Sequence, residues 1–68
     1  MPLSARNQLA GTIEELHLGD VMAHVVVRVG ENQVESVITR TSADDLGLKI
    51  GDHVRVVIKS TEVMIQKD

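Results

Sequence analysis

Two short runs rich in hydroxyl and cationic side chains lie near opposite ends of the chain. Ser4-Ala5-Arg6-Asn7-Gln8-Leu9 leads into apolar, strand-like sequence, and Lys59-Ser60-Thr61-Glu62 follows such sequence. Side chains of these types supply N–H donors, O–H donors and positive charge, which are the groups that bind an oxyanion. Because the two ends of a barrel-sized domain can lie side by side, we expect both runs to contribute to one compact oxyanion pocket.

Each group also has an ordinary structural interpretation. Ser4 can end a polar tail, Arg6 can be a solvated surface charge, and Thr39 with Ser42 can be a strand end followed by a helix cap. These residues nevertheless share one property, since they stand where strands give way to loops. Binding groups of barrels gather at such positions.

Composition limits the fold and its stability. The chain has 68 residues, no Cys, Phe, Tyr or Trp, and a formal net charge of -3. It therefore predicts one small domain over residues 1–68, with an aliphatic core and without disulfides or cysteine-based metal or redox chemistry. So small a core is marginally stable alone, and we expect a homo-oligomer whose subunits share apolar surface.

The same composition bears on location and partners. No run approaches the ~20 apolar residues that span a membrane, and the N-terminus lacks the pattern of a signal peptide. We expect a cytoplasmic protein with no membrane association. The charges are interspersed and their sum is negative, which argues against a general nucleic-acid binder.

Alternating apolar residues predict an all-β fold. Strand-like runs begin at Asn7, Val21, Gln33, Val54 and Val63, and the clearest has Val21, Ala23, Val25, Val27 and Val29 on one face. Turns are expected at Gly19-Asp20 and Gly30-Glu31-Asn32. The apolar face changes parity within the first run, which predicts a bend or bulge, and Gly11 is a suitable place for it.

One helix interrupts the strands. Thr41-Ser42-Ala43-Asp44-Asp45-Leu46-Gly47 has a hydroxyl cap, acids placed for a first turn and a closing glycine. Five short strands, with this helix between the third and fourth, predict a small OB-like barrel.

These residues carry a resemblance to a known family. The Ser4–Leu9 run followed by Gly11, the 39–46 segment, and Lys59-Ser60-Thr61-Glu62-Val63-Met64 resemble the Mop family of molybdate-binding proteins, the molbindins. The resemblance covers residues 4–65. It implies an OB-like barrel, assembly into a hexamer as a trimer of dimers, and binding of molybdate, usually also tungstate, at subunit interfaces.

The resemblance also implies a set of ligand-binding residues. One subunit supplies the side chains of Ser4, Arg6, Lys59 and Ser60; the partner supplies Thr39 and Ser42, with backbone N–H groups near Ala5 and Arg40. The chemistry agrees, because molybdate is a tetrahedral dianion that only accepts hydrogen bonds. Rotatable hydroxyls donate to it, two cations neutralise it, and a helix starting near Ser42 adds N–H groups.

The function expected is molybdate or tungstate binding for intracellular storage, with sulfate excluded by size and protonated phosphate by its O–H. Alternatives are an effector-sensing or purely structural oligomerisation module and, less favoured, a single-stranded nucleic-acid module, for which the chain lacks aromatic platforms. No triad, P-loop or dinucleotide motif is present, so neither catalysis nor a catalytic cofactor is expected. His17, His24 and His53 show no metal-ligand spacing, and Met22 and Met64 are interpreted as packing residues.

Overall fold

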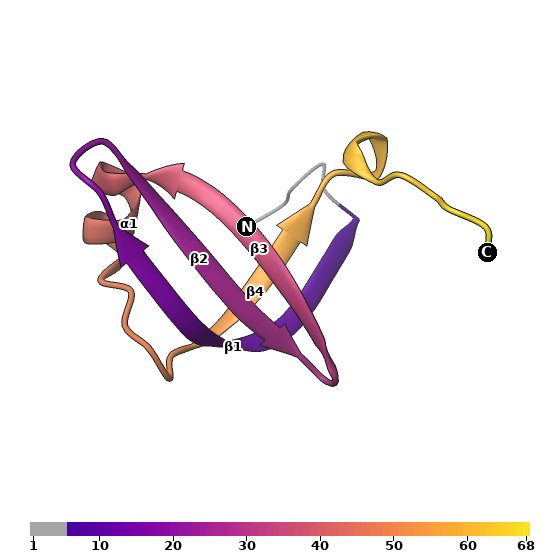
Figure 1. The fold of residues 1–68 in the computed structure, drawn as a ribbon, viewed down its shortest axis with the longest axis horizontal. Coiled ribbons are helices and arrows are strands. Elements are labelled where there is room, and N and C mark those ends of the chain that lie inside the picture. The colour runs from indigo at the N-terminus through magenta and orange to yellow at the C-terminus, as the bar shows by residue number, and fades with distance from the viewer. Residues whose placement is uncertain (1–5) are drawn as a thin grey trace.

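The fold is an antiparallel sheet that carries one short helix. A computed structural model describes residues 6–68 and places four strands in the order β3-β2-β1-β4 (Figure 1). The elements are β1 (Asn7–Leu18), β2 (Met22–Val29), β3 (Asn32–Thr39), α1 (Arg40–Leu46), β4 (His53–Ile58) and the 3-10 turn η1 (Ser60–Glu62). The predicted all-β class, with a helix between the third and fourth strands, is confirmed.

Strand β1 joins the two halves of the sheet because it bends. Its first half, from Asn7 to Thr12, pairs with β4, and its second half, from Thr12 to Leu18, pairs with β2. The predicted irregularity is present, but the register shift falls at Glu14, between the pairs formed by Ile13 and Glu15, rather than at Gly11. An extra residue in one strand increases its twist, which lets β1 serve both neighbours.

Gly11 has a different role from the predicted kink. It sits in the regular ladder opposite Val54, where β1 also approaches β2 closely. A Cβ at Gly11 would lie 2.5 Å from the Arg28 carbonyl oxygen and 2.6 Å from Val27 Cγ1. Glycine is therefore required here by the closeness of the neighbouring backbone.

The helix starts directly at the end of β3. Thr39 is its N-cap, with its hydroxyl oxygen accepting the Ser42 N–H at 3.1 Å, and Gly47 closes it in the left-handed conformation with φ 62°. The first turn contains no acidic residue, contrary to the expectation for Asp44 and Asp45, because the helix begins earlier than predicted. Asp44 instead accepts from Arg40, one turn before it, at 3.1 Å.

The core lies on the concave face of the sheet. Ile13, Val25 and Val27 form its buried centre, and partly buried side chains surround them: Leu16, Val29, Ile38, Leu48, Val54 and Val56. The face predicted to be buried in the second strand is confirmed at Val25 and Val27, but Val26 on the opposite face is buried as well. Ala43 is also buried, and it is the residue through which α1 contributes to the interior.

The predicted fifth strand differs from the structure. Residues 63–68 follow η1 without strand pairing, and Met64 and Ile65 are almost fully exposed. In Figure 1 this segment runs away from the sheet beyond the end of β4. The barrel is thus open between β3 and β4, because the alternating Val63 and Ile65 have no strand partner within the described residues.

Candidate functional site

The first group of predicted binding residues surrounds the start of β1 and the end of β4. Asn7 pairs with Ile58, so the flanking residues Arg6 and Lys59 lie at the same end of these two strands. Both cations are exposed. The expectation that the two chain ends lie side by side is therefore confirmed from Arg6 onwards, whereas Ser4 and Ala5 fall outside the described residues.

A tight turn presents the hydroxyl of this first group. Lys59 precedes η1, and its carbonyl accepts the Glu62 N–H at 2.9 Å, which folds Ser60 and Thr61 back beside Lys59. Ser60 is exposed. Glu62, the last residue of the run identified from the sequence, is the acid of this turn. Hereafter the group of Arg6, Lys59 and Ser60 is called the terminal half-site.

The second group lies where β3 meets α1. The Thr39 hydroxyl donates to Ser42 Oγ at 2.8 Å while its oxygen accepts the Ser42 N–H. This geometry uses the single hydroxyl proton of Thr39 and leaves that of Ser42 available to a ligand. Thr39 and Ser42 are hereafter called the helix half-site.

Arg40 belongs to the same corner but is engaged by the protein. Its N–H donates to the Val21 carbonyl at 2.8 Å, Nη1 donates to the Gly19 carbonyl at 3.0 Å, and Nε contacts Asp44 at 3.1 Å. These bonds tie the β1–β2 turn to the helix. The predicted Arg40 N–H donor thus already has a partner within its own chain.

Thr41, next to Ser42, was not among the binding residues predicted from the sequence. Thr41 is exposed and stands between Arg40 and Ser42 in the first turn of α1. A signal for it existed, because Thr39, Thr41 and Ser42 place three hydroxyls within four residues. Such density is unusual for a surface helix, in whose interior hydroxyl residues are not favoured.

The two half-sites lie on opposite sides of the sheet in one chain. β3 and β4 are the two edge strands of the described sheet, and α1 packs mainly against β2 and β3. Figure 1 shows α1 and η1 at opposite ends of the molecule, whose longest dimension is 36 Å. The full predicted set therefore cannot converge on one anion within a single chain.

The remaining polar clusters are structural surface features. His17 and His24 are opposite each other on β1 and β2, and their rings stack with centroids 5.6 Å apart. Each donates from Nε2 to a separate carboxylate, His17 to Glu15 at 3.2 Å and His24 to Glu35 at 2.7 Å. Within residues 6–68 no group of three His, Cys, Asp or Glu side chains is arranged to hold a metal ion.

Glu14 occupies the bulge of β1 and is held in a small polar network. Arg28 Nε donates to one of its carboxylate oxygens and Gln33 Nε2 donates to the other at 2.8 Å. The hydrogen bond from Arg28, and then that from Gln33, lowers the pKa of Glu14 below its usual value of 4.5. Because Arg28 is committed to this carboxylate, it is a poorer anion ligand than Arg6.

No helix of the described chain is long and apolar enough to cross a membrane.

Comparison with known proteins supports the resemblance drawn from the sequence. The TOBE domain model matches residues 3–65. Molybdenum-pterin-binding protein 1 of Clostridium pasteurianum is 46% identical over 66 residues, covering 96% of this chain and 97% of the relative. Both matches span almost the whole chain, including the two half-sites.

Solved structures agree with this result. A molybdate-binding protein from Sporomusa ovata is 37% identical, with a TM-score of 0.94 over 98% of this chain and all of that chain. The cytoplasmic molybdate-binding protein ModG, solved with molybdate bound, is 36% identical with a TM-score of 0.82; the match covers 88% of this chain and 43% of ModG. The chain belongs to the TOBE domain family, and its relatives there are the Mop-type, OB-like proteins.

Proposed function

We propose that this protein binds molybdate, and with it tungstate, at interfaces between its subunits, and that it serves to store these oxyanions. The observation that carries the proposal is the division of the donor set into two exposed half-sites at opposite sides of one sheet. Each half-site has free donors and neither surrounds an anion alone. Two chains that bring the terminal half-site of one against the helix half-site of the other would complete the site.

The chemistry of the two half-sites is complementary. Arg6 and Lys59 bring the positive charge that a dianion needs, while Ser42 offers a hydroxyl proton that no group within residues 6–68 uses. The helix half-site contributes donors without a further free cation, because the Arg40 guanidinium is held by Asp44 and the Gly19 carbonyl. Ser4 and Ala5 complete the proposed set by position in the sequence.

The free oxyanion suits this chain better than a pterin complex. Pterin rings are flat and are held well by stacking on aromatic side chains, and this chain has no Phe, Tyr or Trp. A tetrahedral dianion needs only directed donors and charge. The names of the molybdenum-pterin-binding relatives therefore support molybdenum as the bound element. The donor set of this chain supports the free oxyanion as the form that is bound.

The proposal extends to assembly, location and chemistry. We place the protein in the cytoplasm as a hexamer, a trimer of dimers, without catalytic activity or a catalytic cofactor. Within the described part of the chain, eleven large apolar side chains are exposed, among them Val21, Val37 and Ile50, which supports an assembly that covers them. Membranes and nucleic acids are not part of the proposal.

The test is native mass spectrometry of the protein alone and with molybdate, tungstate or sulfate. We expect a hexamer that takes up several molybdate or tungstate ions and little sulfate. A hexamer that binds none of the three would reduce the function to a structural role. A monomer without uptake would contradict both the interface site and the assembly.

A further inference from the structure

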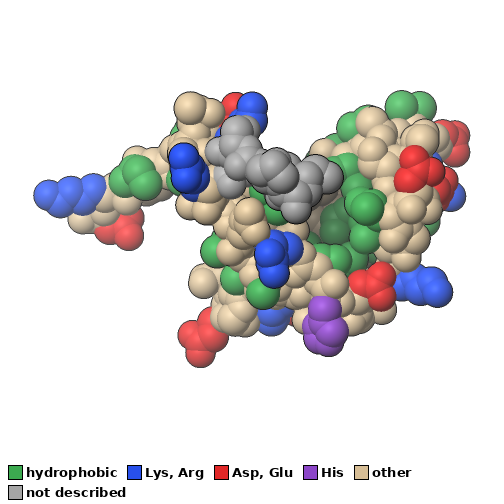
Figure 2. Space-filling view, turned by 180° about the vertical axis from the view of Figure 1, so that it is seen from behind, with side chains coloured by type: hydrophobic (Ala, Val, Ile, Leu, Met, Phe, Trp, Pro, Cys, Tyr) green, Lys and Arg blue, Asp and Glu red, His purple; other side chains and the backbone are tan. Residues whose placement is uncertain are grey.

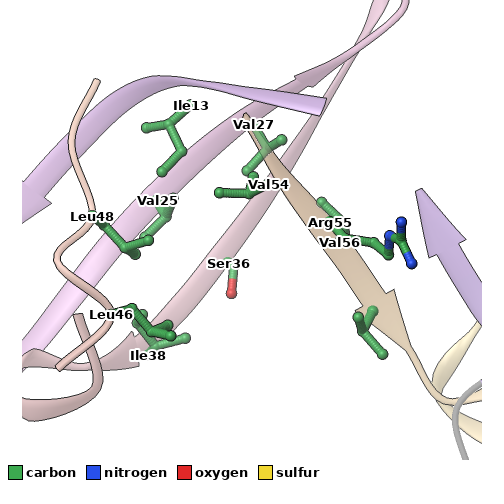
Figure 3. Close-up of a pocket in the computed structure, with 11 residues that line it drawn as sticks. Ile13, Val25, Val27, Ser36, Ile38, Leu46, Leu48, Val54, Arg55 and Val56 are labelled. Atoms are coloured by element: carbon green, nitrogen blue, oxygen red, sulfur yellow. The ribbon is translucent and has the colours of Figure 1, made fainter. Parts of the chain in front are cut away.

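The two faces of the sheet differ in their chemistry. Hydrophobic side chains gather in a hollow on the back of the molecule (Figure 2), and Val25 and Val27 of β2 line this apolar pocket together with Ile13 (Figure 3). Because successive side chains of a strand point to opposite faces, His24 of β2 lies on the other face. The same holds for Glu35 of β3, which precedes a residue of the pocket lining.

On this outer face two histidines lie opposite each other across β1 and β2. His17 and His24 are partners in the register, and their rings stack with centroids 5.6 Å apart and planes inclined by 17°. Residues in directly opposite positions have Cβ atoms about 4.5–5.5 Å apart. From that separation, two imidazoles can reach one metal ion, since metal–nitrogen bonds of zinc are about 2.0–2.1 Å long. The pair therefore has the spacing of a two-histidine chelate.

The Nε2 nitrogens of both rings are held by carboxylates. His17 donates from Nε2 to Glu15 at 3.2 Å, and His24 donates from Nε2 to Glu35 at 2.7 Å. A neutral imidazole that donates from one nitrogen keeps a lone pair on the other. Among the described residues, the hydrogen bonds of these two rings all run through Nε2, so each ring keeps its Nδ1 for a ligand. Metal-bound histidines in proteins have the same arrangement, with a carboxylate on the second ring nitrogen.

The charges beside the pair favour a cation. Within residues 6–68, Glu15 and Glu35 form ion pairs with the two histidines and with no Lys or Arg. Arg28, on the same strand as His24, pairs with Glu14 instead. Two carboxylates without a Lys or Arg partner therefore stand next to the imidazoles. Such a concentration of negative charge attracts a divalent ion.

We propose that His17 and His24 together bind one divalent late transition-metal ion, of the class of Zn²⁺, Ni²⁺ and Cu²⁺, through their Nδ1 atoms. Glu15 and Glu35 orient the rings. These ions prefer imidazole, whereas hard ions such as Mg²⁺ prefer oxygen. The two imidazole side chains are 62% and 38% exposed, so they can turn about their broad χ2 torsions toward one ion, and water completes its coordination. The site lies apart from both half-sites and does not rest on the proposed function.

Isothermal titration calorimetry with ZnCl₂ tests the proposal on the full chain without a polyhistidine tag or molybdate. We expect one Zn²⁺ per chain. His17→Gln or His24→Gln should weaken binding about tenfold or more, because even partners of the ligands account for about 10- to 100-fold in metal affinity. His53→Gln is the matched control, since His53 lies opposite Thr12 at the start of β4, and it should leave the affinity within about twofold.

The outcomes decide between the pair and other ligands. Absence of Zn²⁺ binding, or an equal loss in His53→Gln, would overturn the proposal. Displacement of Zn²⁺ by an equal concentration of Mg²⁺ would assign the ion to carboxylate oxygens and would also overturn it. Circular dichroism without metal should be the same for all variants, because the substituted side chains lie on the sheet surface. Zinc should raise the melting temperature of the wild type and not that of His24→Gln.

Nitrogen NMR of the histidine rings identifies the ligand atoms. Zn²⁺ should shift the Nδ1 resonances of His17 and His24 and leave Nε2 protonated; a shift of Nε2 instead would overturn the assignment of Nδ1. Glu35→Gln keeps the shape of the side chain and removes its charge, and it should weaken Zn²⁺ binding about tenfold. An unchanged affinity would contradict the orienting role of the carboxylate. Molybdate uptake is measured in neither experiment, so failure of the proposed function leaves both results interpretable.

Discussion

Arg6 and Arg40 are both cations of the predicted site, yet their surroundings assign them different roles. The Arg40 guanidinium binds Asp44 and the Gly19 carbonyl, and its N–H binds Val21. Arg6 stands exposed at the start of β1, beside the end of β4. We therefore expect Arg6 to bind the anion and Arg40 to hold the corner from which Thr39 and Ser42 project.

The first prediction concerns Arg6. Arg6→Ala should weaken molybdate binding about ten- to a hundredfold in isothermal titration calorimetry, because a charge-assisted hydrogen bond contributes about 1.5–3 kcal/mol. Arg28→Ala is the control, since Arg28 is bound to Glu14. It should change the affinity less than about threefold. Equal losses in the two variants would refute the assignment of Arg6.

The second prediction concerns Glu14 and acid. Its pKa is lowered by the hydrogen bonds from Arg28 and Gln33, so the folded state favours the ionised carboxylate. This contribution to stability is present above the unfolded pKa and is lost as the pH falls through the lower folded pKa. Glu14→Gln should therefore destabilise the protein at pH 7 and have a smaller effect at pH 3.

Urea unfolding at equal protein concentration measures this difference. Glu31→Gln, in the exposed β2–β3 turn, provides a control whose effect should stay small at both pH values. A Glu14→Gln effect that did not shrink in acid would show that the network stabilises the bulge without the charge of its carboxylate.

At the scale of elements, local patterns predicted most of the sheet. Alternation located the second strand because one face of it, at Ala23, Val25 and Val27, is buried. The helix begins at Arg40, before the predicted start near Ser42, because Thr39 at the end of β3 forms the cap. Turn residues placed both hairpins, since turn chemistry is local.

The elements that sequence could not place depend on distant partners. The bulge falls at Glu14 because β1 must pair with β4 and then with β2, a constraint that no residue of β1 displays. Val63 and Ile65 have the alternation of a strand but pair with none of the described strands of their own chain. An alternating pattern indicates that a segment can form a strand, whereas its pairing depends on the strand that lies next to it.

The third prediction tests the close approach at Gly11. Gly11→Ala should destabilise the protein by about 1–3 kcal/mol, because its Cβ would meet the Arg28 carbonyl at 2.5 Å and neither backbone can yield easily. Chemical unfolding measures the loss. Ala10→Ser, at the adjacent exposed position, should cost less than about 0.5 kcal/mol. A neutral Gly11→Ala would mean that β1 and β2 can separate at this point without cost.

At the scale of the whole molecule, the sequence named candidate site residues without showing how the fold separates them. Residue types and the family resemblance named both half-sites. Their placement on opposite edges follows from the strand order β3-β2-β1-β4, which brings the chain ends together and carries Thr39 away from them. The family resemblance already implied a site between two subunits, and the strand order gives a physical reason for it.

The expected division of the site between subunits gives the fourth prediction, a complementation between two inactive variants. Arg6→Ala removes the cation of the terminal half-site, and Ser42→Ala removes the free hydroxyl of the helix half-site while the Thr39 cap on the Ser42 N–H remains. Each variant alone should bind molybdate poorly at every site. When the two are co-expressed, roughly one site in four should combine an intact terminal half-site with an intact helix half-site from the other chain, if the chains mix at random.

Calorimetry on the co-expressed assembly, purified through a tag on each chain, would measure the recovery as a fraction of sites with wild-type affinity. Recovery can occur only if the two half-sites that bind one anion belong to different chains. A site built within one chain would contain the substitution of that chain in every assembly. An assembly that contains both variants yet binds no better than either alone would therefore place the anion within a single subunit. Recovery would instead place each anion at a contact between two subunits.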